Sequence, residues 1–308
     1  MTTPLTTPLI VVVTTGGTIA STVDTDGVSR PSLDGGALVG DAAEAVGVRV
    51  RVVEALRVDS STLTLADAWT VVSAVRDALA DPEVAGVVVL HGTDSLEETA
   101  YLLDLHHDDA RPVVLTGSQR TADHPEPDAA ENVRYALWAA TSTSGVAVAF
   151  RGGLVLAAGA AKRHTTDLDA FAAPDGPLPH VPLAPVDAPW PRVDVVAGHP
   201  GMDGVLLDAC VTAGARGIVL QALGSGNATP AVVDAVARAR AAGVAVVLTT
   251  RVPAGPVTTT YGDGGGGADL AAAGVVPAGR LKAGQARVLL AALLRAGADV
   301  AAGFAARG

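Results

Sequence analysis

The chain has 308 residues, of which 49% are hydrophobic and 17% charged, and its net charge of −11 disfavours nucleic acid or an anionic membrane surface as a partner. So apolar a composition excludes a disordered chain, and a single cysteine excludes an intramolecular disulfide. No basic cluster precedes the first, short apolar run, so we expect neither a signal peptide nor a membrane span. We expect a cytoplasmic α/β protein with about two domains and a small-molecule substrate.

The first predicted strand, Leu9–Val13, is a run of apolar, mostly β-branched residues, typical of a strand buried on both faces of a parallel sheet. Ligands of such sheets bind beyond the carboxyl ends of the strands, where this chain continues as Thr14-Thr15-Gly16-Gly17-Thr18. Thr15 is therefore a candidate nucleophile, although a plain strand-to-loop turn explains the same residues. The polar stretch Thr22–Asp34 is expected to be a mobile loop at the mouth of the site.

A second hydroxyl-rich segment follows the next strand. Residues 48–53 alternate valine with arginine, which predicts a strand near the sheet edge with one solvated face. Asp59–Thr64 comes after it, and Thr64 is placed to cap a helix over residues 65–80, with Asp67 at capping-box spacing. Helix capping and ligand binding explain the hydroxyls of this segment equally well.

The next buried strand, Gly86–Leu90, ends in a segment with more capping residues than one helix needs. It contains two overlapping capping boxes, Asp94 with Glu97 and Ser95 with Glu98. If Ser95 caps the helix that runs to about Leu105, then Thr93 and Asp94 are left at a strand tip without a structural duty. They would face the same crevice as Thr15.

Residues 112–116 form another buried strand, ending near Ser118, before a helix over residues 129–143 and a β-hairpin over 146–157. Lys162 lies just beyond the hairpin. The chain has 19 arginines and only 2 lysines, so a lysine kept against this bias indicates a task that arginine cannot perform. A lysine amine can act as a base, whereas arginine is effectively never deprotonated.

Seven prolines between residues 174 and 191 predict a stiff connector, so we expect an N-terminal domain over 1–173, a linker over 174–190 and a C-terminal domain over 191–308. The second half alternates strands (193–196, 218–220, 244–249) with helices (205–213, 230–242, 283–296). The expected fold is α/β, with a larger N-terminal, mainly parallel sheet flanked by helices and a smaller C-terminal α/β domain. The pair His106-His107 is expected at a solvated helix end, and we predict no metal and no organic cofactor.

Two long motifs, Thr15-Gly16-Gly17-Thr18-Ile19-Ala20-Ser21 and His91-Gly92-Thr93-Asp94-Ser95-Leu96-Glu97-Glu98-Thr99-Ala100, stand in this order about 70 residues apart. Together they resemble the paired signatures of the bacterial-type L-asparaginase/glutaminase family. The resemblance covers nearly the whole chain and continues through 59–61, 116–118, 162–167, 224–227 and 251–255.

The resemblance implies an amidohydrolase that converts L-asparagine to L-aspartate and ammonia through a threonine acyl-enzyme. Thr15 would be the primary nucleophile, and Thr93, Asp94 and Lys162 a second set that relays protons or readies the deacylating water. Backbone N–H groups near Thr93 and in the loop of Gly16 would stabilise the oxyanion.

The same resemblance implies how the substrate is held. Asp94, with Thr93 beside it, would bind the α-ammonium of the substrate, Ser61 and Thr62 its α-carboxylate, and the backbone of Ser118 its carboxamide. The counterpart of Asn227 reaches a neighbouring subunit in this family, so a homo-oligomer, usually a tetramer built as a dimer of dimers, is implied.

The sequence departs from the family pattern where a base for Thr15 is needed. Relatives often carry a tyrosine in the loop after the first motif, and residues 22–34 contain none. Arg30 is the only large polar candidate in that loop, and in the second half Tyr261 and Asp263 are the nearest candidates for an acidic residue that some relatives contribute. The group that deprotonates Thr15 is therefore left open.

Two alternatives to an asparaginase remain at this point. The first is a glutaminase-asparaginase of broader amide specificity, because one methylene in a pocket is worth only about 1–3 kcal/mol. The second is a two-domain small-molecule binding protein, which would not need the lysine and the doubled threonine.

Overall fold

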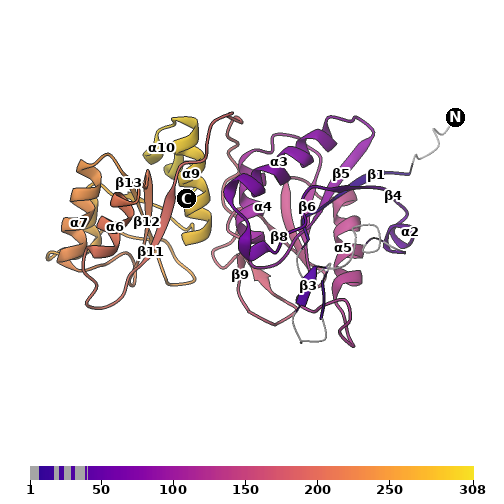
Figure 1. Cartoon of the computed structure of the whole chain (residues 1–308), viewed down its shortest axis with the longest axis horizontal. Coiled ribbons are helices and arrows are strands. Elements are labelled where there is room, and N and C mark those ends of the chain that lie inside the picture. The colour runs from indigo at the N-terminus through magenta and orange to yellow at the C-terminus, as the bar shows by residue number, and fades with distance from the viewer. Residues whose placement is uncertain (1–6, 17–20, 24–28, 32–38, 40) are drawn as a thin grey trace. The chain divides into compact units, whose positions relative to one another are not determined.

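The structure is a computed structural model that describes residues 7–16, 21–23, 29–31, 39 and 41–308 (Figure 1). The chain divides into two compact units, residues 1–173 and residues 174–308. The first unit has a mainly parallel sheet and the second unit a parallel sheet, each with helices packed on it. The predicted α/β fold class is confirmed.

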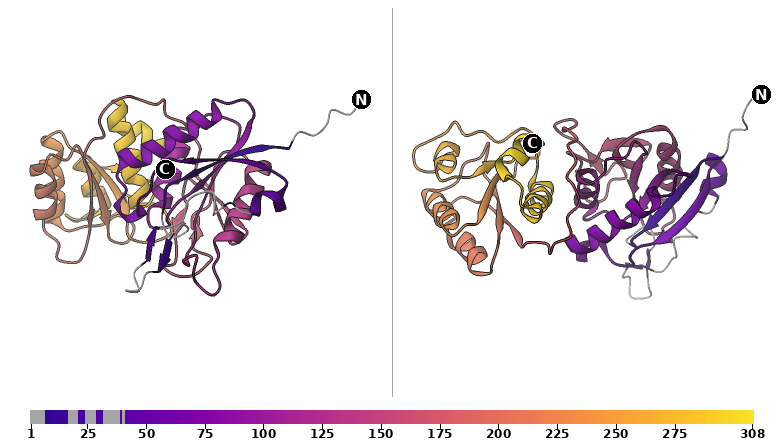
Figure 2. Two further views of the ribbon diagram at one scale, coloured as in Figure 1. Left: turned by 45° about the vertical axis from the view of Figure 1, so that its right-hand side comes forward. Right: turned by 90° about the horizontal axis from the view of Figure 1, so that it is seen from above.

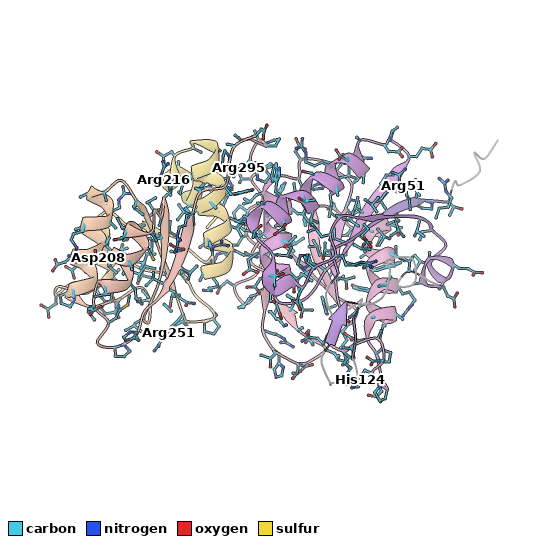
Figure 3. The ribbon with its side chains drawn as sticks, viewed as in Figure 1. Arg51, His124, Asp208, Arg216, Arg251 and Arg295 are labelled. Carbon is cyan, nitrogen blue, oxygen red and sulfur yellow. The ribbon has the colours of Figure 1, made fainter. Side chains whose placement is uncertain are left out.

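The sheet of the first unit has six strands in the order β4-β1-β5-β6-β7-β8. All neighbours are parallel except the terminal pair of β7 and β8. The strands are β1 (Leu9–Thr14), β4 (Arg49–Glu54), β5 (Val84–Leu90), β6 (Val113–Thr116), β7 (Val146–Phe150) and β8 (Gly153–Leu156). As predicted, β4 is an edge strand with a solvated face, and its Arg51, labelled in Figure 3, reaches Asp81 at 2.9 Å.

Helices cover both faces of this sheet, which is why its central strands are continuously apolar (Figure 1). The helices are α2 (Ala42–Val46), α3 (Leu65–Leu79), α4 (Leu96–Leu105) and α5 (Ala129–Ser142). One core cluster joins alternate residues of β1 and β5, such as Ile10 and Val88, to the apolar face of α5 around Leu137. The helices α3 and α4 pack against each other and on strands of the same sheet.

The second unit has a parallel sheet in the order β11-β12-β13-β14, with α6 and α7 on one side and α9 on the other (Figure 1). Its strands are β11 (Val193–Ala197), β12 (Gly217–Ala222), β13 (Ala245–Thr250) and β14 (Val276–Pro277). Its helices are α6 (Val205–Thr212), α7 (Pro230–Ala241), α8 (Gly267–Ala272), α9 (Ala283–Ala296) and α10 (Val300–Ala305). The short α10 packs beside α9 (Figure 2).

Several short elements differ from the prediction. The expected loop Thr22–Asp34 overlaps two short strands, Ser21–Val23 (β2) and Ser29–Pro31 (β3), which pair antiparallel. The rest of that loop lies outside the described residues. The helices α2, α8 and α10 were not predicted, because each has only five or six residues and shows too little periodicity.

Within the described chain, residues 174–192 form no helix or strand. Prolines recur along this segment, and a proline has no N–H to donate to a strand ladder or a helix. None of the described helices is long and apolar enough to cross a membrane.

Candidate active site

In the first sheet, the strand register places the predicted site residues at the carboxyl edge of the parallel strands. Thr14 on β1 is aligned with Leu90 on β5, and Leu90 with Thr116 on β6. Because the three strands are parallel neighbours, the residues that follow them meet at the same carboxyl edge. Thr15 follows β1 directly, and Thr93 and Ser118 lie three and two residues beyond their own strands.

Thr15 is bound to the neighbouring strand by both of its donors. Its Oγ1 and its backbone N–H each donate to the carbonyl oxygen of Leu90 at 3.1 Å, and the side chain is almost fully buried. A nucleophilic role requires this hydroxyl to exchange its hydrogen bond with Leu90 for one with a base, since a threonine hydroxyl is weakly nucleophilic by itself.

Gly16 allows the chain to turn sharply after Thr15. Its φ is +93°, and a Cβ atom placed on it would lie 2.8 Å from the carbonyl oxygen of Val58. Val58 also donates its N–H to the carbonyl oxygen of Thr15 at 3.0 Å. Only glycine fits this conformation and this space. The predicted oxyanion contribution of the loop beyond it falls on residues 17–20, which lie outside the described residues.

Thr93, Asp94 and Lys162 come together. The Nζ atom of Lys162 donates to Thr93 Oγ1 at 2.7 Å and lies 3.2 Å from Asp94 Oδ1. Thr93 is buried, whereas the side chain of Asp94 keeps 60% of its exposure and that of Lys162 only 20%. The Thr93 hydroxyl and the Lys162 amine are therefore largely covered by protein, whereas the Asp94 carboxylate is accessible to a ligand.

The residues around Ser61 and Thr62 are attached to the same loop. Ser60, Ser61 and Thr62 form a 3₁₀ turn, in which the Asp59 carboxylate accepts from both the N–H and the hydroxyl of Ser61 at 3.0 Å. Ser60 joins this turn to the end of β5, because its Oγ accepts from the N–H of Asp94 at 3.3 Å. The exposed Ser61 and Thr62 thus lie on a segment bonded directly to Asp94.

The predicted N-terminal capping is confirmed for α3 and wrong for α4. Thr64 and Asp67 form the expected capping box of α3. Ser95 is the N-cap residue of α4, but its side chain makes no capping hydrogen bond and donates instead to the Ser60 carbonyl at 2.6 Å. Ser95 therefore links two loops of the site, a role that local spacing did not indicate.

The loop that carries Ser118 is held by two residues that sequence reasoning missed. The carboxylate of Asp128 accepts from the N–H groups of Gln119 and Arg120, each at 3.0 Å. Asn132 donates to Gly117 O and to Asp128 at 3.0 Å, and its Oδ1 accepts from the N–H of Arg151 at 2.9 Å. A buried asparagine on the apolar face of a predicted helix was the signal that could have found this network.

Ser118 itself is completely buried, and its hydroxyl has no hydrogen-bond partner among the described residues. Gly117, just before it, packs so closely on β5 that a Cβ atom would lie 2.4 Å from the His91 carbonyl oxygen. The backbone of Ser118 is thereby held beside the tip of β5. This position suits the predicted backbone contact with a substrate.

Two ionisable groups beside the site have shifted pKa values. Burial lowers the pKa of His91 to about 4, so its imidazole is neutral, and its Nδ1 lies 2.7 Å from the Gly92 carbonyl oxygen. Burial, and secondarily the neighbouring Glu98, raises the pKa of Glu97 to about 7, against the opposing effects of Lys162. Sequence reasoning treated Glu97 only as a capping residue.

Three of the remaining candidates, Asn227, Tyr261 and Asp263, belong to the second unit. Asn227 belongs to the second unit, where its Oδ1 accepts from the N–H of Gly267 at 3.2 Å. Tyr261 and Asp263 are exposed residues of that unit, and the side chain of Arg30 lies outside the described part. None of these placements identifies a base for Thr15.

The histidine pair at the end of α4 is not solvated, contrary to prediction. Both side chains are buried: His106 lies edge-on against Trp69, with ring centroids 4.8 Å apart, and His107 Nε2 is 2.8 Å from Arg111 O. Helix-end residues can be covered by a neighbouring helix and loop, which sequence position alone does not reveal. Among the described residues, no group of three His, Cys, Asp or Glu is placed to hold a metal ion.

Comparisons with known proteins match both units. The family model described as "Asparaginase, N-terminal" matches residues 9–190, and that described as "Glutaminase/Asparaginase C-terminal domain" matches residues 192–302. An L-asparaginase of Bacillus licheniformis is 33% identical, with 92% of this chain and 95% of the relative covered. A probable L-asparaginase of Deinococcus radiodurans is 35% identical, with 96% of each chain covered.

The fold has a close match among solved structures. The crystal structure of a probable cytoplasmic L-asparaginase from Campylobacter jejuni is similar with a TM-score of 0.85 and 26% identity. The match covers 97% of this chain and 99% of that protein.

Proposed function

Because the chain belongs to the asparaginase family of amidohydrolases, we propose that it hydrolyses L-asparagine to L-aspartate and ammonia through an acyl-enzyme on Thr15. The observation that carries the proposal is the contact of 2.7 Å between Lys162 Nζ and Thr93 Oγ1 at the sheet edge that also holds Thr15. A binding protein would have no need of an amine hydrogen-bonded to a buried hydroxyl there.

In the proposed reaction, the Thr15 hydroxyl oxygen attacks the carboxamide carbon and gives its proton to a base. The amide nitrogen takes up a proton and leaves as ammonia, which leaves an ester on Thr15. Thr93 and Lys162 then direct a water molecule at the ester, and aspartate is released as the hydroxyl is restored. Backbone N–H groups at the strand tips stabilise the oxyanion, at about 3 kcal/mol per donor.

Substrate binding is proposed to use the exposed polar groups of the same edge. Asp94, beside Thr93, would bind the α-ammonium, and its exposed carboxylate is consistent with that role. Ser61 and Thr62 would bind the α-carboxylate, and the backbone of Ser118 the carboxamide.

Assembly and location are part of the same proposal. We expect a homotetramer in which Asn227 contributes to a neighbouring site. We also expect a cytoplasmic enzyme, in line with the description of the Campylobacter jejuni structure.

Replacing Thr15 tests the nucleophile. Thr15→Ala should lower kcat for ammonia release from L-asparagine by on the order of 10³-fold or more, because the acyl-enzyme cannot form. Thr70→Ala, an exposed threonine on α3, is the matched control and should keep wild-type kcat. Turnover by folded Thr15→Ala at the wild-type rate would remove Thr15 from this role.

The choice of amide is tested separately. The C-terminal family model names both glutaminase and asparaginase, so broader amide specificity is the second candidate. The ratio of kcat/KM for L-asparagine and L-glutamine decides between them. If neither L-asparagine nor L-glutamine yields ammonia, a binding protein is favoured.

A further inference from the structure

Glu97 contacts the proposed catalytic lysine through the lysine backbone. Lys162 lies on β9 (Ala161–Lys162), a two-residue strand that pairs antiparallel with β10 (Phe171–Ala172). In this pair, Arg163 donates its N–H to Ala170 O at 2.8 Å, so the N–H of Lys162 points away from β10. The carboxylate of Glu97, in the first turn of α4, accepts that N–H.

This hydrogen bond holds the backbone of Lys162, from which its side chain extends. A strand of two residues has few ladder bonds of its own, so its orientation depends on outside contacts. The amine at the far end of the same residue reaches Thr93 at 2.7 Å and Asp94 at 3.2 Å. A shift of the Lys162 backbone would therefore be passed on to both contacts.

We propose that Glu97 is a positioning residue whose carboxylate holds the backbone of Lys162 so that the amine stays between Thr93 and Asp94. Its carboxylate contacts the backbone of Lys162, so it would act through that lysine and not directly on the substrate. The kinetic part of this inference rests on the proposed function, whereas the structural part does not.

The charge of Glu97 gives the contact a pH dependence. In the part of the chain that the structure describes, two charged groups act on its carboxylate: Glu98 on its own helix raises its pKa, and Lys162 on β9, whose amine also binds Asp94, lowers it. With a pKa of about 7, Glu97 is an anion above neutral pH and a neutral acid below it. An anion accepts the stronger hydrogen bond, so Lys162 is held more firmly above pH 7.

The chain offers an unusually clean spectroscopic test, because Lys162 and Lys282 are its only lysines. Lysine-selective ¹³C labelling gives two Cε signals, and Lys282→Arg assigns them. In the wild type, the Lys162 signal should shift with an inflection near pH 7, and Glu97→Gln should abolish that inflection. Glu131→Gln, which removes an exposed first-turn carboxylate from α5, should leave it unchanged.

Kinetics supply the second measurement. Glu97→Ala should lower kcat by on the order of 10- to 100-fold, because the amine is displaced. Glu97→Gln keeps an acceptor for the Lys162 N–H, so it should restore most of kcat but lose the inflection near pH 7 in the pH profile.

The outcomes separate the two proposals. If the wild type releases no ammonia from either amide, the proposed function fails and the NMR titration still decides the role of Glu97. A Lys162 signal without the inflection in the wild type, or with it in Glu97→Gln, overturns the positioning role. Wild-type kcat and pH profile in folded Glu97→Ala would also overturn it.

Discussion

At the scale of single residues, the two lysines of the chain make contacts of different kinds. Lys162 contacts a buried hydroxyl and a carboxylate in the candidate site. Lys282 is structural: its Nζ donates to Gly255 O at 2.8 Å and lies 3.4 Å from the Asp175 carboxylate. The contacts of Lys162 support the chemical task proposed for it, whereas those of Lys282 show a charge and hydrogen-bond role. Composition alone could not distinguish them.

Replacing each lysine with arginine tests whether the residue is needed as a base or only for its positive charge. Lys162→Arg keeps the positive charge near Asp94 but cannot act as a base, so kcat for ammonia release should fall by about 10²- to 10⁴-fold. Lys282→Arg, the matched control, should keep wild-type kcat. Equal kcat for the wild type and Lys162→Arg would show that only the charge of Lys162 matters.

At the scale of elements, the C-terminal end of α3 is held by one arginine from a distant loop. Arg111 donates to the carbonyl oxygens of Asp81 at 3.0 Å and Val84 at 3.1 Å, and also to that of Leu79. Asp109 orients the guanidinium through two hydrogen bonds, of 2.9 Å to Nε and 2.6 Å to an Nη atom. The last carbonyls of a helix have no partner within it, so Arg111 completes the end of α3 at Leu79 and joins it to the turn before β5.

This contact predicts an acid sensitivity of the first unit. The hydrogen bond from Arg111 lowers the pKa of Asp109 from its ordinary 3.8 to about 2, so the carboxylate stabilises the fold above about pH 4 and this contribution is lost as the pH falls towards 2. Asp109→Asn should lower the urea midpoint above pH 4 and approach the wild type near pH 2.

The adjacent and exposed Asp108 supplies the control, since Asp108→Asn should leave the midpoint unchanged at every pH. A constant difference between the wild type and Asp109→Asn from pH 6 to pH 2 would contradict the assigned ion pair.

At the scale of the whole molecule, the proline-rich segment 174–190 is attached to the second unit by arginines. Arg295 on α9, labelled in Figure 3, donates to Ala188 O at 2.7 Å and lies over the Trp190 ring at 4.2 Å. Arg307 donates to Val181 O at 2.8 Å. We propose domains over 1–173 and 191–308, with 174–190 as the connector. The arginine contacts explain how a segment without helix or strand keeps a single conformation.

Removing the two arginines should expose the connector. In Arg295→Ala/Arg307→Ala, proteinase K should cleave within residues 174–190 about tenfold faster than in the wild type, because local opening there costs less free energy. Arg216→Ala, outside these contacts, is the control. Unchanged cleavage would show that proline stiffness alone protects the segment.

Much of the fold could be predicted because the relevant signals are local. The strand around Val12, the helix around Leu137 and the edge strand with Arg51 each show their period and burial in a few adjacent residues. The candidate site could be predicted in part, since parallel strands bring Thr15 and Thr93 to one edge. For the network of Asp128 and Asn132, the sequence offers at most a sign that Asn132 needs a partner, because the groups that it and Asp128 hold are backbone atoms of residues 117–120 and 151.

The sequence by itself determined the fold class, the alternation of strands and helices and the residue types at the strand tips, because apolar periodicity and motif spacing act over short ranges. Only the tertiary structure decided the partners of Ser95 and Glu97. A hydroxyl or carboxylate at a helix start can bind its own helix or a neighbouring loop, and the choice depends on which distant N–H or carbonyl group the fold brings within reach. For these two residues that group was Ser60 O and the N–H of Lys162.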